Sequence, residues 1–181
     1  GINYGGLTLL ASVCGDGTAD VTGTTSFAIT GPNAGTAASG IAYDQFDAAS
    51  DATTVADAVD FDDAGPSSQG ITFASATNVS GTGTISSVAG AFDDATLVSD
   101  ASNIDYDGFT AVSGTGTALT GVNVSFDDTT KPSGSGVDYS GFAVATVSGG
   151  ATSLTGVDTS FDDSTQISGS GINYGGLTSL A

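Results

Sequence analysis

The chain lacks almost every side chain that could carry positive charge: its 181 residues include one lysine, Lys131, and no arginine or histidine. Twenty aspartates and no glutamate give it a net charge of −19. Because binding to phosphates and anionic lipids depends on basic side chains, nucleic-acid binding and adhesion to such membranes are excluded. Without histidine and arginine, the chain cannot build a Ser–His–Asp triad, a histidine-ligated zinc site or a guanidinium clamp on phosphate.

Other absences bear on the fold. The single cysteine, Cys14, excludes an intrachain disulfide, and no apolar run reaches the ~18 residues that cross a bilayer. Glutamate, arginine and methionine, which favour helices, are missing, whereas threonine, valine, isoleucine, phenylalanine and glycine are frequent. Hydrophobic residues make up 39% of the chain and charged ones only 12%, unlike the composition of disordered chains. The composition therefore predicts a folded all-β protein without membrane insertion.

An internal repeat organises the whole chain. The sequence Gly-Ile-Asn-Tyr-Gly-Gly-Leu-Thr occupies residues 1–8 and occurs again at 171–178. A second motif, Phe-Asp-Asp, recurs at intervals of 31, 34 and 35 residues, and Ser26-Phe27 takes its place in the first unit. Residues 1–181 are therefore predicted to form one continuous array with units of about 34 residues, starting near residues 1, 40, 70, 103, 136 and 171. Because the first and last units open with the same residues, we expect a segment or subunit of a longer fibre.

The fold class follows from the pattern inside each unit. Ile104 and Tyr106 alternate with Asp105 and Asp107, which is the period of a strand with one apolar face. One unit holds too few apolar residues for a core of its own, so the units must stack on one another. We therefore predict an all-β fold, a β-solenoid (β-helix) of stacked repeats. The alternative is a repeated β-sandwich, although the tryptophan and paired cysteines of immunoglobulin domains are missing.

The aspartate pairs that follow the four phenylalanines are the candidate site. In one interpretation they only begin the turn after a strand. In the other, stacking places the pairs in register as a column of like charges, and Ca²⁺ relieves their repulsion, although neither an EF-hand loop nor a glycine-rich calcium-binding nonapeptide is present. No other cofactor is expected. The candidate metal ligands are Asp62, Asp63, Asp93, Asp94, Asp127, Asp128, Asp162 and Asp163.

Catalysis and surface binding are the remaining classes. Paired carboxylates carry out glycoside hydrolysis, but a catalytic site occurs once per domain, whereas this pair occurs four times. We therefore expect no enzymatic activity. The Thr-Gly-Thr sequences at 82–84 and 115–117 could align as an exposed threonine array, as in ice-binding solenoids, or simply follow the preference of threonine for strands.

In composition the chain resembles the long Asp/Gly/Ser/Thr-rich repeat regions of bacterial or archaeal surface proteins, adhesins and extracellular fibres. This resemblance implies an extracellular or cell-surface location and a structural role, and it assigns no functional residue. The expected function is a stalk, filament or surface fibre formed by stacking and end-to-end self-association, with divalent cations as further partners. The alternative is a surface-binding module for carbohydrate, ice or a host surface.

Overall fold

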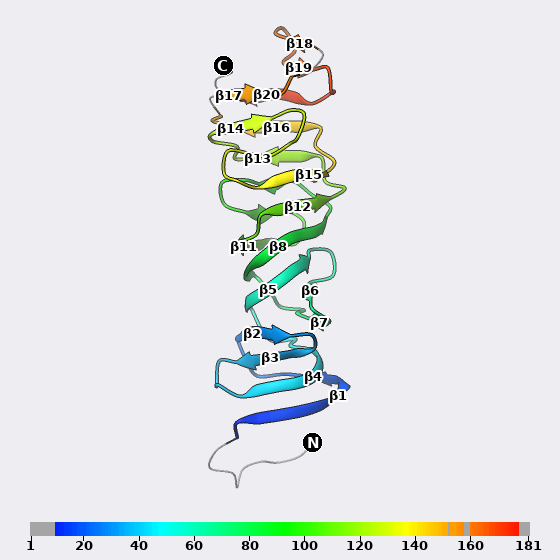
Figure 1. The fold of residues 1–181 in the computed structure, drawn as a ribbon, viewed down its shortest axis with the longest axis vertical. Helices are drawn as coiled ribbons and strands as arrows, with labels where there is room; N and C mark the ends of the chain where they lie inside the picture. The colour runs from blue at the N-terminus through cyan, green and yellow to red at the C-terminus, as the bar shows by residue number, and fades with distance from the viewer. Residues whose placement is uncertain (1–9, 152, 158–159, 178–181) are drawn as a thin grey trace.

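The computed structural model describes residues 10–151, 153–157 and 160–177, and this part of the chain forms strands and turns without a helix. The strands run across the long axis of the molecule and stack along it in about six coils (Figure 1). The predicted all-β class and β-solenoid are confirmed. Within the described ranges, no helix is long and apolar enough to span a membrane.

The strands are mostly short, with two to eleven residues each. In chain order they are β1 (Ser12–Asp20), β2 (Ser26–Gly31), β3 (Ala34–Ala37), β4 (Ala42–Ala48), β5 (Thr54–Asp62), β6 (Ser67–Ser68), β7 (Ile71–Thr72), β8 (Asn78–Val88), β9 (Phe92–Asp93), β10 (Val98–Ser99), β11 (Ile104–Asp107), β12 (Ala111–Gly114), β13 (Ala118–Thr120), β14 (Ser125–Asp127), β15 (Asp138–Phe142), β16 (Thr146–Gly149), β17 (Ser153–Thr155), β18 (Phe161–Asp162), β19 (Ile167–Ser168) and β20 (Asn173–Leu177).

Successive coils pair through parallel strands, and a coil is shorter than the sequence repeat. Phe92 on β9 pairs with Leu119 on β13, 27 residues further along the chain. Across the molecule the parallel partners are separated by 23 residues, as in Val59 with Thr82, up to 30, as in Ser12 with Ala42. One unit of about 34 residues therefore covers one coil and roughly a quarter of the next.

Because of this difference, the phenylalanines of successive units lie in different interior columns. The columns, read along the parallel pairs, are Phe27, Val55, Val79 and Tyr106; Phe61, Ile85 and Val112; Phe92, Leu119 and Val147; and Phe126 and Leu154. Successive aspartate pairs are therefore not stacked on one another. Asp62 pairs with Ser86, and Asp127 pairs with Thr155. The expectation of an in-register column of aspartates is wrong, because the coil and the repeat have different lengths.

After each Phe-Asp-Asp motif the chain forms a small antiparallel meander. Strand β9 pairs with β10, and β10 pairs with β11. The same arrangement links β18, β19 and β20 near the C-terminal end. The meander brings the serine and the aromatic residue that follow each motif toward the interior, and this positions the candidate site. The aromatic residue is Phe73 in one unit and a tyrosine in the other three.

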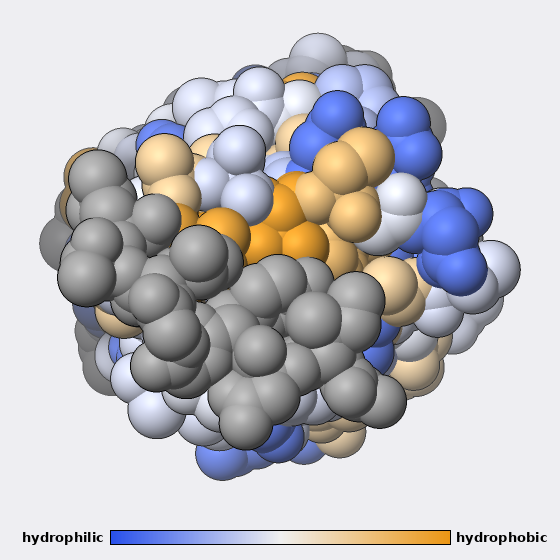
Figure 2. Space-filling model, turned by 90° about the horizontal axis from the view of Figure 1, so that it is seen from below, coloured by the Kyte–Doolittle hydropathy of each residue, from blue (hydrophilic) through white to orange (hydrophobic). Residues whose placement is uncertain are grey.

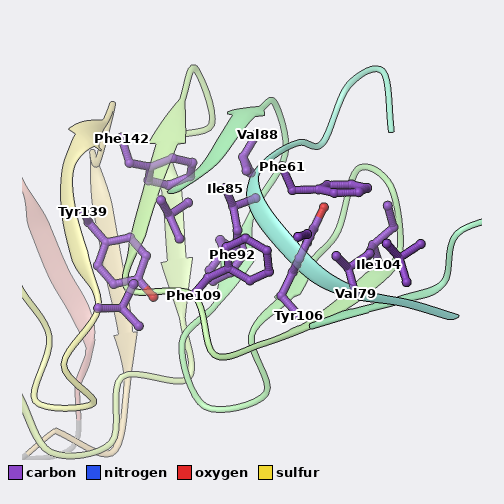
Figure 3. Packing of buried hydrophobic residues seen from close by; sticks show 14 of the residues in the cluster. Phe61, Val79, Ile85, Val88, Phe92, Ile104, Tyr106, Phe109, Tyr139 and Phe142 are labelled. Atoms are coloured by element: carbon purple, nitrogen blue, oxygen red, sulfur yellow. The ribbon is translucent and has the colours of Figure 1, made fainter. Parts of the chain in front are cut away.

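The columns form one continuous core. Seen from its N-terminal end, the molecule has hydrophobic residues at its centre and hydrophilic residues around them (Figure 2). Phe61, Phe92 and Tyr106 point into this core with the aliphatic residues of the neighbouring coils (Figure 3). Burying one such side chain contributes ~1.5–3 kcal/mol, and a ring pair such as Phe61–Tyr106, with centroids 5.8 Å apart, adds ~0.5–1.5 kcal/mol.

Glycine is required where coils approach closely. Gly114 and Gly149 follow Val-Ser in successive units and have φ angles of 150° and 147°. A Cβ atom at these positions would clash with the carbonyl oxygens of Val88 and Val122. Part of the glycine content is therefore explained by the spacing of the backbone between coils.

Candidate functional site

The first aspartate of each pair stabilises the turn that follows its strand. Asp62 Oδ1 accepts hydrogen bonds from the backbone N–H groups of Ala64 (3.0 Å) and Gly65 (3.1 Å). Asp127 does the same with Thr129 (3.0 Å) and Thr130 (2.8 Å). The other two units repeat this turn through Asp93 and Asp162. The turn interpretation is therefore confirmed for the first aspartate of each pair.

The pKa values of two of these aspartates reflect the turn. Backbone N–H donation by Thr130 is the main cause that lowers the pKa of Asp127. At Asp162 the hydroxyl of Ser164 lowers the pKa most, followed by the backbone N–H of Thr165. Both groups lie at the surface, so the ionised form is retained through local hydrogen bonds rather than through an ion pair.

The second aspartate of the pair points inward and is buried in three of the four units. Asp63, Asp94 and Asp128 are only 3–4% exposed. Asp94 Oδ1 accepts hydrogen bonds from the hydroxyls of Ser133, Ser135 and Tyr139, each at 2.7 Å. We refer to these four residues as the Asp94 network.

The same set of donors recurs at the other two buried aspartates. The Asp63 network contains the hydroxyls of Ser99 (2.9 Å), Ser102 and Tyr106 (2.7 Å). The Asp128 network contains those of Ser168 (3.0 Å), Ser170 (2.8 Å) and Tyr174. No buried side-chain oxygen or nitrogen in the described part of the chain lacks a hydrogen-bond partner. Three hydroxyl donors per carboxylate therefore replace the water that burial removes.

Each network joins segments that lie 36 to 46 residues apart in the chain. The backbone N–H of Asp94 donates to the carbonyl of Thr120 on the next coil (2.9 Å). Its side chain instead meets Ser133, which lies in the antiparallel meander that begins at Phe126. Phe92 makes a matching contact, since its ring centroid lies 6.0 Å from that of Tyr139 at the end of the same meander. A network therefore ties the aspartate of one motif to the meander that follows the next motif.

Burial and the nearby carboxylate raise the pKa of the tyrosine in each network. Burial raises the pKa of the Tyr139 phenol far above its usual value, and the negative charge of Asp94 raises it further. At Tyr106 and Tyr174 burial is again the main cause, followed by the hydrogen bond to the buried aspartate. The phenols therefore remain protonated and act as donors.

Two units depart from this pattern. In the first, Phe27-Ala28-Ile29 replaces Phe-Asp-Asp, and the buried Ile29 stands where the other units have a buried aspartate. The residue equivalent to the network tyrosines is Phe73, whose ring centroid lies 6.1 Å from that of Phe27. In the last unit Asp163 is exposed, and no hydroxyl donates to it in the described part of the chain.

Seven of the eight predicted metal ligands therefore have one of two roles, turn cap or buried acceptor, and Asp163 has neither in the described part of the chain. No group of three or more aspartates or cysteines that could hold a metal ion occurs within the described ranges. In the three networks the carboxylate oxygens accept hydrogen bonds from hydroxyls, and these bonds satisfy the carboxylates without a cation. Calcium binding at the aspartate pairs stays a prediction.

Two other surface features bear on chemistry. A groove of about 370 Å³ beside Asp63 is lined mainly by alanines, with Asp63 as its one titratable group. It offers no second acid or base for proton transfer. The two Thr-Gly-Thr sequences do not stack, because Thr82 pairs with Val59 and Thr84 with Ala111. The expected threonine array is not formed by these residues.

The serine and tyrosine donors were missed by sequence reasoning. Their signal is the sequence Ser-x-Ser-Gly-Val-x-Tyr at 133–139 and its near copies, together with Phe73 where the acceptor is Ile29. Comparison of the chain with protein-family models, curated proteins and solved structures finds no match. Conclusions about its function therefore rest on the residues and geometry described above.

Proposed function

We propose that the protein is an extracellular structural element that forms a stalk, filament or surface fibre by end-to-end stacking of its β repeats. The observation that supports this is the direction of the bonds between coils. The strands run across the long axis, so the backbone hydrogen bonds that pair them between coils run along it (Figure 1). A pull along that axis would be resisted by many parallel bonds at once, which suits a load-bearing rod.

The surface suits the same role. A net charge of −19 keeps such rods soluble and separate from one another. The chain has no arginine and its one lysine precedes Pro132, so it offers almost no site to trypsin-like proteases. Both properties favour survival outside the cell.

Assembly would use strand edges without partners. Strand β9 pairs in parallel with β13, and β14 pairs with β17. The equivalent strand of the last unit, β18, pairs only with β19 in the described part of the molecule. Such an edge accepts another strand.

Electron microscopy of the purified chain over a range of concentrations tests the proposal. We expect filaments of uniform width that lengthen with concentration. A chain that stays monomeric at every concentration would contradict the fibre. Binding of a glycan by that monomer would instead support the surface-binding alternative.

A further inference from the structure

Two incomplete networks stand at opposite ends of the described chain. Near the C-terminal end, Asp163 follows Phe161 and Asp162 as Asp128 follows Phe126 and Asp127. The turn is the same, since Gln166 N–H donates to the carbonyl of Asp162 (2.7 Å) as Lys131 N–H donates to that of Asp127 (2.8 Å). Asp163 is nevertheless exposed, without the hydroxyl donors of its three equivalents.

The matching donors occur near the N-terminal end. The segment Ala37-Ala38-Ser39-Gly40 has the backbone bonds of Ser133-Gly134-Ser135-Gly136. Ala37 N–H donates to the carbonyl of Ile41 (3.1 Å), as Ser133 N–H donates to that of Val137 (3.0 Å). Ser39 therefore corresponds to Ser135, and Tyr43 corresponds to Tyr139.

These donors have no acceptor within the described residues. Tyr43 is half-buried against Phe27 and Phe46, with ring centroids at 6.2 and 5.2 Å, and its hydroxyl makes no hydrogen bond there. Ser39 is exposed and its hydroxyl is likewise unbonded. One end of the solenoid thus has the acceptor of a network, and the other end has two of its three donors.

The strands at the two ends match as well. In the Asp63 network, β8 lies between the acceptor and the donors: Val79 pairs with Tyr106, while Ser86 pairs with Asp62. Strand β1 repeats β8, with Val13, Gly15, Gly17 and Thr18 in the places of Val79, Gly81, Gly83 and Thr84, and Val13 pairs with Tyr43. Gly17 and Gly83 even share a positive φ, 85° and 89°. Within the described chain β1 pairs only with β4, so its other edge is open.

We propose that a second copy of the chain stacks on the first, so that Asp163 of one copy accepts the hydroxyls of Ser39 and Tyr43 of the next. Strand β1 of the second copy then pairs in parallel with β18 of the first, as β8 pairs with the end of β5. Residues 171–178 of one copy and residues 1–8 of the next have the same sequence. If one of these two segments fills this place in the repeat, the repeat keeps its phase across the joint. This inference rests on the proposed fibre and names the contact that would build it.

The proposed register has an electrostatic cost. Ser86 pairs with Asp62, and the residue of β1 that corresponds to Ser86 is Asp20. Asp20 would therefore lie beside Asp162 of the other copy, and neighbouring like charges weaken a sheet. Association should consequently strengthen with ionic strength, since salt screens this repulsion.

Complementary variants test the joint. Asp163→Ala removes the acceptor and leaves the donors intact, whereas the double variant Ser39→Ala/Tyr43→Phe removes the donors and leaves the acceptor. We expect each variant alone to be folded and to lose filament formation, with association at least tenfold weaker than that of the unmodified chain. A mixture of the two retains one intact joint and should give a discrete heterodimer, measured by light scattering after size exclusion. A reducing agent keeps Cys14 on β1 from forming disulfides.

Two controls separate the joint from general effects. Asp100→Ala removes an equally exposed aspartate away from both ends. Tyr139→Phe removes an internal network hydroxyl. Both should still form filaments.

If the unmodified chain forms filaments and the two end variants do so equally, the fibre stands and this joint is wrong. If folded end variants form no heterodimer when mixed, the joint is also wrong. An unmodified chain that never associates contradicts the fibre itself.

Discussion

The interior contacts of the first unit and of the later units fill equivalent positions with different side chains. Phe27 packs against Phe73 and Tyr43, and the buried Ile29 takes the place of the aspartate. Around Phe92 it combines an aromatic pair with a buried carboxylate and three hydroxyls. Acceptor and phenol change together: where aspartate becomes isoleucine, tyrosine becomes phenylalanine. The serine remains, since Ser68 is buried and donates to the carbonyl of Val59 (3.1 Å). Each buried polar side chain in the described part of the chain thus keeps a hydrogen-bond partner in both versions of the contact.

The hydrogen-bonded networks add selectivity for one register between coils. An apolar contact tolerates a shift of one strand relative to its neighbour, because isoleucine and phenylalanine pack against many partners. A buried carboxylate that meets a leucine instead of hydroxyls would lose its hydrogen bonds, at a cost of several kcal/mol. The networks therefore penalise misaligned coils in a chain whose repeats are otherwise alike.

The largest expected effect comes from placing the polar acceptor in the apolar contact. Ile29→Asp buries a charge without donors and should lower the free energy of unfolding by ~3–5 kcal/mol. Adding Phe73→Tyr supplies one donor and should recover ~1.5–3 kcal/mol. Urea unfolding followed by circular dichroism measures both. If the second substitution recovers nothing, Phe73 is not the equivalent of Tyr139.

Removing a hydroxyl from a complete network should cost less. Tyr139→Phe leaves the Asp94 carboxylate with two donors and should destabilise the protein by ~1.5–3 kcal/mol. The matched control is Tyr43→Phe in dilute solution, where the hydroxyl has no acceptor among the described residues and the change should stay within ~0.5 kcal/mol. Equal effects of the two variants in urea unfolding would show that the networks add no stability.

Alkaline pH should weaken the networks gradually. In the unfolded chain a tyrosine releases its proton near pH 10, while burial holds the pKa of Tyr106, Tyr139 and Tyr174 above that value in the folded protein. The folded state then binds more protons, so stability is fully present below pH ~10 and falls above it, by up to ~1.4 kcal/mol per pH unit for each tyrosine. Urea midpoints measured across this range should fall less steeply in Tyr139→Phe. A parallel slope in the variant would contradict this origin.

The smallest expected effect concerns calcium. If the surface aspartates bind it as predicted, calcium at a concentration equal to its dissociation constant stabilises the fold by only ~0.4 kcal/mol. The melting temperature with calcium and with EDTA measures this, and Asp127→Asn should reduce the difference. A melting temperature that is the same in both solutions would remove the metal hypothesis and leave the aspartates as turn caps and network acceptors.

The repeat and the solenoid were predictable because they depend on patterns that one sequence displays. Recurrence of Phe-Asp-Asp and alternation such as that around Tyr106 are local signals. The turn role of Asp62 was predictable for the same reason, since an aspartate caps the residues next to it.

The networks were not predictable in this way. The donors to Asp94 lie 39 to 45 residues away, and aspartate is usually exposed, so nothing near the motif indicates burial. The register was also hidden, because the coil length is set by how strands such as β9 and β13 turn and pair, and it differs from the period of the sequence.

That mismatch between coil and repeat has a geometric consequence for any assembly. The pairings carry Phe27 through β5, β8, β11 and β10 to Phe92, and they carry Phe92 through β13, β16, β20 and β19 to Phe161. Every second unit therefore returns to the same stack of strands, and with strands ~4.8 Å apart equivalent motifs on one stack recur every ~24 Å along the rod. Chemically identical motifs thus alternate between two stacks, and a stacked copy can continue that alternation in only one rotational orientation.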